Sequence, residues 1–172
     1  GVLMEVMQKK LLARQAILDI NLKTIGYELL FRNSLDNKFN GASPEKATSQ
    51  IVLQNHILGD LSDVCLGKLA FINFDEFTIL QNSPLLFNPK SLVVELLETI
   101  KITDELVFRI SQLRKKNYIV ALGDYDFSDK WESIFPYISI IKVDIDKVSF
   151  SQIEELKKRL LSLKSNIKIV AK

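Results

Sequence analysis

Apolar and polar residues alternate along this chain in short blocks that predict strands separated by helices. Two strand-like runs come first, at residues 11–19 and 24–32, and the four-residue connection between them is short enough for an antiparallel hairpin. Ser43 and Pro44 are typical of a helix start, and we expect that helix to run to about Leu58. Further strands are expected at residues 69–74, 92–97, 119–122, 138–143 and 167–171.

Two of the helices between the later strands have clear start signals. Thr103 is a typical N-cap for a helix at 104–116. Ser151 and Glu154 have the spacing of a capping box for a helix at 152–164. In that second helix we expect Ile153, Leu156, Leu160 and Leu163 to face inward, and Glu154 with Lys158 and Glu155 with Arg159 to pair outward. A short helix is also expected near Trp131, whose side chain we assign to core packing.

Strands that recur about every 20 to 30 residues with helices between them indicate parallel βα units, because parallel neighbours need a crossover connection. A (β/α) barrel and a doubly wound sheet both satisfy this pattern. No Gly-x-Gly-x-x-Gly or phosphate-binding loop follows any predicted strand, which removes the main positive evidence for a nucleotide-binding open sheet.

The strand count bears on the barrel alternative. Two initial strands and five later ones are about one strand and one helix short of an eight-stranded barrel. If the fold is an α/β, TIM-like barrel, we therefore expect it to be truncated at its C-terminus. Residues 1–172 would form a single domain, the N-terminal portion of a longer protein.

Charge and composition exclude several classes of function. The 23 lysines and arginines nearly balance the 21 acidic residues, and a net charge of +2 gives no sign of a nucleic-acid-binding surface. The single cysteine, Cys65, lacks the spacing of a metal or redox motif and is expected to be a buried, inert thiol. No apolar run approaches the ~18 residues that span a bilayer, and no secretory signal is present. We expect a cytoplasmic protein.

Polar residues stand where the predicted strands end. Any one of them could simply be solvated at the rim, but in a barrel the functional groups come from these strand ends, so their recurrence favours a shared site. The acids and the asparagine supply oxygen ligands suited to Mg²⁺ or Mn²⁺, and the cations suit phosphate, which together fit metal-assisted phosphodiester hydrolysis. The residues concerned are Glu28, Arg32, Asn73, Glu95, Glu98, Asp124, Lys142 and Asp144.

The stretch Gly-Tyr-Glu-Leu-Leu-Phe-Arg at 26–32 resembles the signature of EAL domains, bacterial phosphodiesterases that hydrolyse cyclic di-GMP on a barrel whose first strand is antiparallel. The sequence around Gln15 and Glu28, with Trp131 downstream, is most similar to the branch in which an EAL domain is joined to a C-terminal HDOD domain. The likeness covers nearly the whole chain in family order, through 13–17, 72–73, 95–98, 122–125, 141–144 and 170–172.

The resemblance implies a role for each matching residue. Metal ligands for Mg²⁺ or Mn²⁺ would come from Glu28, Asn73 and Glu95, with Asp124 beside them in an incomplete set. Gln15 and Arg32 would contact cyclic di-GMP, Lys142 would help to position the attacking water, and Glu98 would support the loop after Asp124.

Two departures from the family pattern argue against activity. The family has two consecutive aspartates where this chain has Gly123 and Asp124, and the missing first one is a metal ligand. Glycine cannot coordinate a cation through a side chain, and Asp124 points to the opposite face of the strand. The family also has a glutamate where this chain has Lys172, so an ammonium near the cluster lowers the negative charge that would hold two divalent ions. A two-metal site should therefore be hard to form.

Three functions remain open at this point. The first is a catalytically silent EAL-type domain in cyclic di-GMP regulation, which either holds the nucleotide as a receptor or serves as a platform for a protein partner such as the HDOD domain. The second is an active, metal-dependent cyclic di-GMP phosphodiesterase. The third is a structural module without nucleotide binding.

Overall fold

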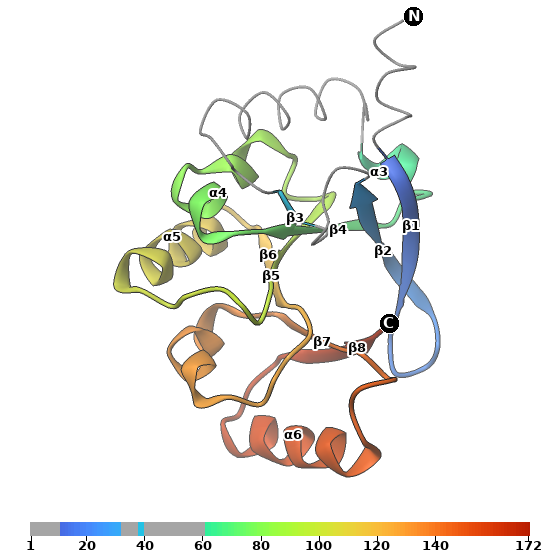
Figure 1. Ribbon diagram of the computed structural model, residues 1–172, viewed down its shortest axis with the longest axis vertical. Helices are drawn as coiled ribbons and strands as arrows, with labels where there is room; N and C mark the ends of the chain where they lie inside the picture. Colours follow the sequence, from blue (N-terminus) through green and yellow to red (C-terminus); the bar gives the residue numbers. More distant parts are fainter. Residues whose placement is uncertain (1–10, 32–37, 40–60) are drawn as a thin grey trace, which may run out of the picture.

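The computed structural model describes residues 11–31, 38–39 and 61–172, and it shows a ring of strands with helices outside it (Figure 1). The strands are β1 Leu11–Leu18, β2 Thr24–Phe31, β3 Lys38–Phe39, β4 Leu69–Phe74, β5 Leu92–Leu96, β6 Ile119–Leu122, β7 Ile140–Val143 and β8 Lys168–Ala171. The helices are α3 Leu61–Val64, α4 Glu76–Leu80, η1 Ser83–Leu86, α5 Asp104–Lys115, η2 Asp129–Tyr137 and α6 Phe150–Ser162.

The seven predicted strands all form, and they close into a barrel. The strand order is β2-β1-β8-β7-β6-β5-β4-β3, and an additional pairing of β2 with β4 completes the ring. β1 runs antiparallel to β2 and β8, whereas the other neighbours in the ring are parallel. The expected barrel with an antiparallel first strand is confirmed.

The junctions of this ring differ in extent. β1 and β2 share a long antiparallel register that reaches from Leu11 opposite Phe31 to Leu18 opposite Thr24. The register between β1 and β8 consists of the one pair Leu18 and Ala171. The two-residue β3, which the sequence pattern did not predict, pairs with the end of β4 beyond the residues that contact β2.

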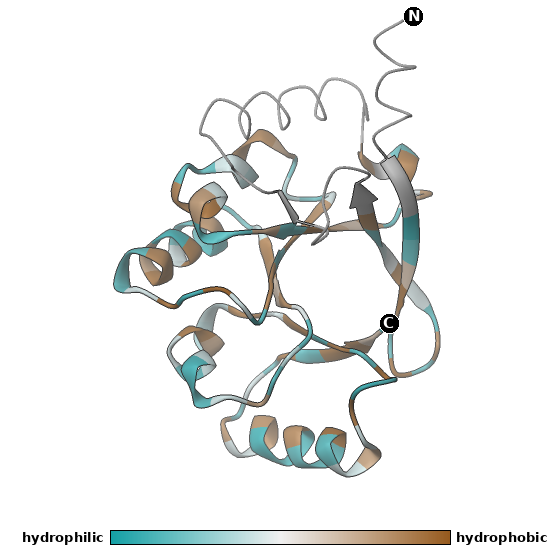
Figure 2. Ribbon diagram, in the orientation of Figure 1, coloured by the Kyte–Doolittle hydropathy of each residue, from teal (hydrophilic) through white to brown (hydrophobic). Residues whose placement is uncertain are grey.

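Side chains of the strands form two separate apolar layers because successive residues point to opposite faces. The outer layer packs against the helices, each of which has an apolar side and a polar side (Figure 2). The inner layer fills the ring and consists of Ile17, Phe71, Val93, Ala121, Ile140 and Val170.

Helix α5 confirms its sequence signals. Thr103 caps it through its hydroxyl oxygen, which accepts a hydrogen bond from the backbone N–H of Leu106 at 3.2 Å. Leu106, Ile110 and Leu113 are buried, as the apolar stripe predicts. The short helix near Trp131 is the 3₁₀ helix η2, and the Trp131 indole is fully buried in the core.

The predicted start of α6 is wrong by two residues. The capping box is Ser149 with Gln152, rather than Ser151 with Glu154, because the same spacing occurs two positions earlier. The helix therefore ends at Ser162, and Leu163, which was expected to face inward, is its C-cap and is 55% exposed.

The outward pairs predicted on α6 also differ. Glu154 pairs with Lys157, at 3.2 Å, rather than with Lys158. Arg159 reaches the neighbouring η2 rather than Glu155, and it pairs there with Glu132 and Asp129. Tertiary neighbours thus supply a nearer carboxylate than the helix itself.

Some predictions lie outside the part of the chain that the structure describes. These are the helix from Ser43 to Leu58 and the side chain of Arg32. Within the described residues, Cys65 is buried as expected. None of the helices in these ranges combines the length and the apolar character that crossing a membrane requires.

Candidate functional site

The candidate site is a layer of polar residues that lies directly above the inner apolar layer of the barrel. On each contributing strand, the residue of the polar layer stands two positions after an apolar residue of the inner layer. Because side chains alternate along a strand, the two residues point to the same side, the inside of the ring. The pairs are Phe71 with Asn73, Val93 with Glu95, Ala121 with Gly123, Ile140 with Lys142, and Val170 with Lys172. Since these strands are parallel, the layer lies at their C-terminal ends, as predicted.

Glu28 joins this layer from β2, and Lys142 connects it to Glu95. The Lys142 ammonium lies 3.2 Å from Oε1 of Glu28 and also contacts Oε1 of Glu95. The Asn73 amide donates a hydrogen bond to the same Glu28 oxygen at 3.3 Å. The Lys172 ammonium lies 3.4 Å from the other oxygen, Oε2. These five residues, all of which the sequence comparison with the family had singled out, therefore meet in one network.

Burial and charge act against each other in this network. Burial would raise the pKa of Glu28, but the ammonium groups of Lys142 and Lys172 outweigh it and hold that pKa below its ordinary value. Burial raises the pKa of Glu95 to about 7, in spite of the attraction of Lys142. Burial would lower the pKa of Lys142, but the two carboxylates raise it. Glu28 and Lys142 are thus both charged at neutral pH.

Gly123 leaves space that the Glu95 carboxylate occupies. A Cβ atom added at Gly123 would overlap Oε1 of Glu95 and would lie 2.9 Å from its Cδ. The same oxygen contacts Lys142. The absence of a side chain at Gly123 therefore allows Glu95 to lean toward β6 and to form a buried ion pair with Lys142.

This arrangement does not fit a divalent metal ion. Among residues 11–31, 38–39 and 61–172, no three acidic, histidine or cysteine side chains are grouped so that they could hold one. The two carboxylates of the network are each in contact with an ammonium group. A metal ligated by Glu28 and Glu95 would have to displace Lys142 from both, against the attraction between opposite charges.

Asp124 and Glu98 lie at the rim, outside this network. The backbone of Asp124 has a left-handed φ of 47°. Buried oxygens of both side chains, Oδ1 of Asp124 and Oε2 of Glu98, have no hydrogen-bond partner within the described ranges. Asp124 is the main cause of the raised pKa of the exposed Lys147, to which Asp144 and Glu98 also contribute. The backbone carbonyl of Glu98 accepts a hydrogen bond from the Lys130 ammonium, and this contact connects the segment after β5 to η2.

Gln15 lies at the open edge of the site. It is opposite Glu28 in the register of β1 and β2, on the same inward face as the buried Ile17, and its side chain is exposed. Because β1 runs antiparallel, this early residue reaches the same mouth as the ends of the later strands. Arg32, the second predicted nucleotide contact, lies outside the described residues.

Sequence reasoning missed two contacts of this network, that of Lys172 with Glu28 and that of Lys142 with Glu95. It did expect the Lys172 ammonium to lie near the cluster, and the alternation of β8 agrees with this inward direction, since Val170 belongs to the inner layer. The partners of the two lysines could not be found from the sequence, because they depend on how the strands pack in the closed ring.

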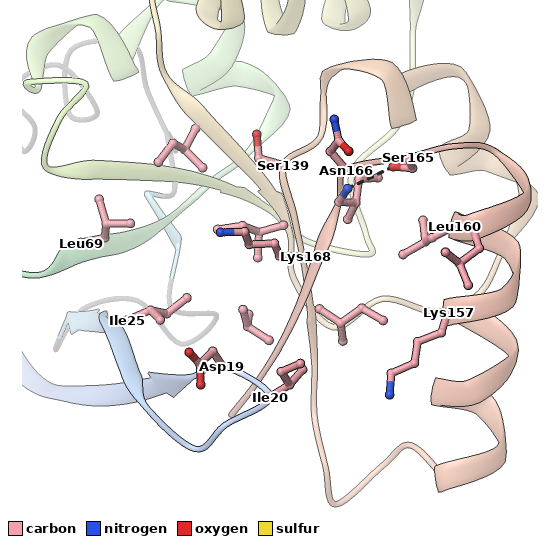
Figure 3. A pocket seen from close by; sticks show the side chains of 16 residues that line it. Asp19, Ile20, Ile25, Leu69, Ser139, Lys157, Leu160, Ser165, Asn166 and Lys168 are labelled. Carbon is pink, nitrogen blue, oxygen red and sulfur yellow. Dashed lines mark hydrogen bonds between the residues drawn. The ribbon is translucent and has the colours of Figure 1, made fainter.

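The opposite mouth of the barrel is mainly apolar. A pocket of about 880 Å³ lies there between the β1–β2 connection and α6, lined by residues that include Ile25, Leu69, Ile140 and Leu160 (Figure 3). Lys168 projects into it from β8. The strand β8 therefore begins with a lysine at this mouth, Lys168, and is followed directly by another at the polar mouth, Lys172.

Comparison with known proteins supports the fold and the resemblance. No protein-family model matches the sequence. The uncharacterized protein YuxH of Bacillus subtilis is 35% identical over 142 residues, which are 80% of this chain and 35% of that protein. The cyclic di-GMP phosphodiesterase CdgJ of Vibrio cholerae is 34% identical over 142 residues, covering 82% of this chain and 33% of that protein. The chain thus spans about a third of these relatives.

A solved structure decides the fold. The YkuI protein of Bacillus subtilis, which has an EAL domain, was solved in complex with its substrate cyclic di-GMP and calcium. It aligns with 91% of this chain and 47% of its own at a TM-score of 0.64 and 18% identity. The chain therefore has the fold of this EAL-domain protein. In this barrel, the mouth that carries Glu28, Asn73, Glu95 and Lys142 is the one at which the parallel strands end.

Proposed function

We propose that this EAL domain is a cyclic di-GMP receptor that does not cleave the nucleotide. The nucleotide class is supported by the similarity to CdgJ, which is named as a cyclic di-GMP phosphodiesterase, and by the structure of YkuI, which holds cyclic di-GMP. The lack of cleavage is supported by the contacts of Glu95 and Lys142 in this chain.

The observation that carries the proposal is the position of the Glu95 carboxylate. It fills the space above Gly123 and contacts Lys142, which also contacts Glu28. A lysine held by two buried carboxylates is not available to orient a water molecule, and carboxylates held by a lysine are poor ligands for a dication. Both groups that hydrolysis would require are thus engaged with each other.

Binding without cleavage is supported by the groups at the mouth. Gln15 is exposed on the inward face, and the Lys172 side chain is 22% exposed. An amide and an ammonium are donors that suit the oxygens of a nucleotide. In the cell we propose that this receptor is cytoplasmic and passes its signal to a C-terminal HDOD domain. A pure protein platform would not need these open donors.

The alternative, a metal-dependent phosphodiesterase, rests on one observation: Glu28, Asn73, Glu95 and Lys142 all meet within one network. Hydrolysis would require Lys142 to leave Glu95 and a metal to take its place. The two functions therefore differ in what divalent cations do to the protein.

The test is calorimetric titration of the full chain with cyclic di-GMP in EDTA, in Mg²⁺ and in Mn²⁺, followed by chromatography for the linear dinucleotide. We expect binding in all three buffers and recovery of intact nucleotide. Linearised product in Mn²⁺ would overturn the proposal in favour of the phosphodiesterase. A lack of binding in every buffer would overturn the receptor in favour of a protein platform.

A further inference from the structure

The charged groups of the site alternate in sign from its base to its mouth. Glu95 contacts Lys142, Lys142 contacts Glu28, and Glu28 contacts Lys172. The exposed fractions of the four side chains are 0%, 1%, 2% and 22% in that order. Lys172 is therefore the member of this series that meets solvent.

When Glu95 is ionised, the charges in the series sum to zero, since two carboxylates face two ammonium groups. A neutral cluster with an ammonium at its open end attracts an anion more than a dication. The ion pair with Oε2 of Glu28 engages one side of the Lys172 ammonium, which has three N–H donors. Donors thus remain for a ligand that approaches from the mouth.

We propose that Lys172 is a tethered cation that takes the place of a metal ion and holds a phosphate group of the bound nucleotide. This inference rests on the proposed receptor function and adds to it the residue that makes binding independent of metal. In this arrangement the Lys172 ammonium lies between two negative groups, the Glu28 carboxylate on its inner side and the phosphate oxygens on its outer side. A charge-assisted contact of this kind contributes about 1.5–3 kcal/mol, which corresponds to roughly 10- to 100-fold in affinity.

Lys168 provides a matched control at the other end of β8. It is the first residue of that strand, four residues before Lys172, and it lines the apolar pocket at the opposite mouth (Figure 3). Lys168→Glu and Lys172→Glu change the net charge of the protein by the same amount. A difference between them therefore reports the position of the charge and not its sign alone.

The first measurement is the affinity of the full chain for cyclic di-GMP in EDTA, by calorimetry. We expect Lys172→Glu to weaken binding by at least tenfold and Lys168→Glu to leave it within about twofold of wild type. Lys172→Met, which keeps the length of the side chain and removes its charge, should also weaken binding. Thermal unfolding of each variant checks that it is folded. Equal affinities of wild type and both Lys172 variants would overturn the inference while leaving the receptor intact.

The second measurement is the binding of Mn²⁺ alone, followed by electron paramagnetic resonance. We expect no binding to wild type or to Lys168→Glu, and a bound fraction for Lys172→Glu, because three carboxylates would then face one ammonium. Binding of Mn²⁺ to wild type would overturn the role of a tethered cation. Cleavage of the nucleotide by wild type would instead overturn the receptor, so the two failures are distinguishable.

Discussion

The two halves of the barrel interior are built on the same strands, yet they have opposite chemistry. The lower layer is apolar and includes Phe71, Val93 and Ile140, whereas the layer two residues further along holds Asn73, Glu95 and Lys142. Burial of the apolar layer stabilises the folded protein by roughly 25 cal/mol for each Å² of apolar surface removed from water. In the second layer burial is unfavourable for each charge and is offset only by its partner. Stability and chemistry are thus separated by one step of the strand alternation.

The strongest test of this comparison removes the cation that both buried carboxylates share. Lys142→Met should lower the free energy of unfolding by about 3–5 kcal/mol, because it leaves Glu95 buried without a partner. Urea denaturation measures the change. Adding Glu95→Gln should recover part of the loss, since the neutral amide no longer needs the ammonium. Losses that simply add would contradict the ion pair.

A second test adds a side chain at Gly123, where the Glu95 carboxylate occupies the space that a Cβ atom would take. Gly123→Ala should lower the free energy of unfolding by about 1–3 kcal/mol, because its Cβ overlaps the carboxylate and forces it away from Lys142. The same substitution in a Glu95→Ala background should cost little, since the overlapping group is gone. A neutral effect in the wild-type background would show that Glu95 moves aside freely.

A third test uses the pKa of Glu95, which is raised to about 7 from an ordinary value of 4.5. Between these values the folded protein holds a proton that the unfolded chain has lost, so this group's contribution to stability falls as the pH rises. We expect the stability of wild type relative to Glu95→Gln to fall by roughly 1–2 kcal/mol from pH 5 to pH 7. Parallel stability curves for the two proteins over this range would contradict the raised pKa.

The smallest effect is expected in the apolar layer. Ile140→Val removes one methyl group from the inner core and should lower the free energy of unfolding by about 0.5–1.5 kcal/mol. The loss should not depend on pH, since the residues of this layer are apolar and none of them is titratable. Nucleotide affinity in EDTA should be unchanged, which separates the two halves functionally.

The sequence predicted alternating strands and helices because period-2 apolar runs recur between helical ones, and the family resemblance selected the barrel from the two folds that satisfy this pattern. The polar layer was predicted because strand ends such as Asn73 and Lys142 share one mouth of a barrel. The sequence pattern misplaced the start of α6, because Ser149 and Ser151 both satisfy the same local spacing. It did not predict the contact between Lys142 and Glu95 in the space above Gly123. That contact depends on the packing of three strands, which no local pattern encodes.

The single pairing of Leu18 with Ala171 makes the barrel a ring with a seam. It joins residues near the two ends of the described chain, and contacts between such distant residues have the highest entropic cost of closure. Gln15 lies on one side of this seam and Lys172 on the other, whereas Asn73 and Glu95 sit on adjacent parallel strands far from it. The open edge of the site is therefore assembled across this seam, so a chain whose ring has not closed presents its buried carboxylates without both of the outer donors that would receive a nucleotide.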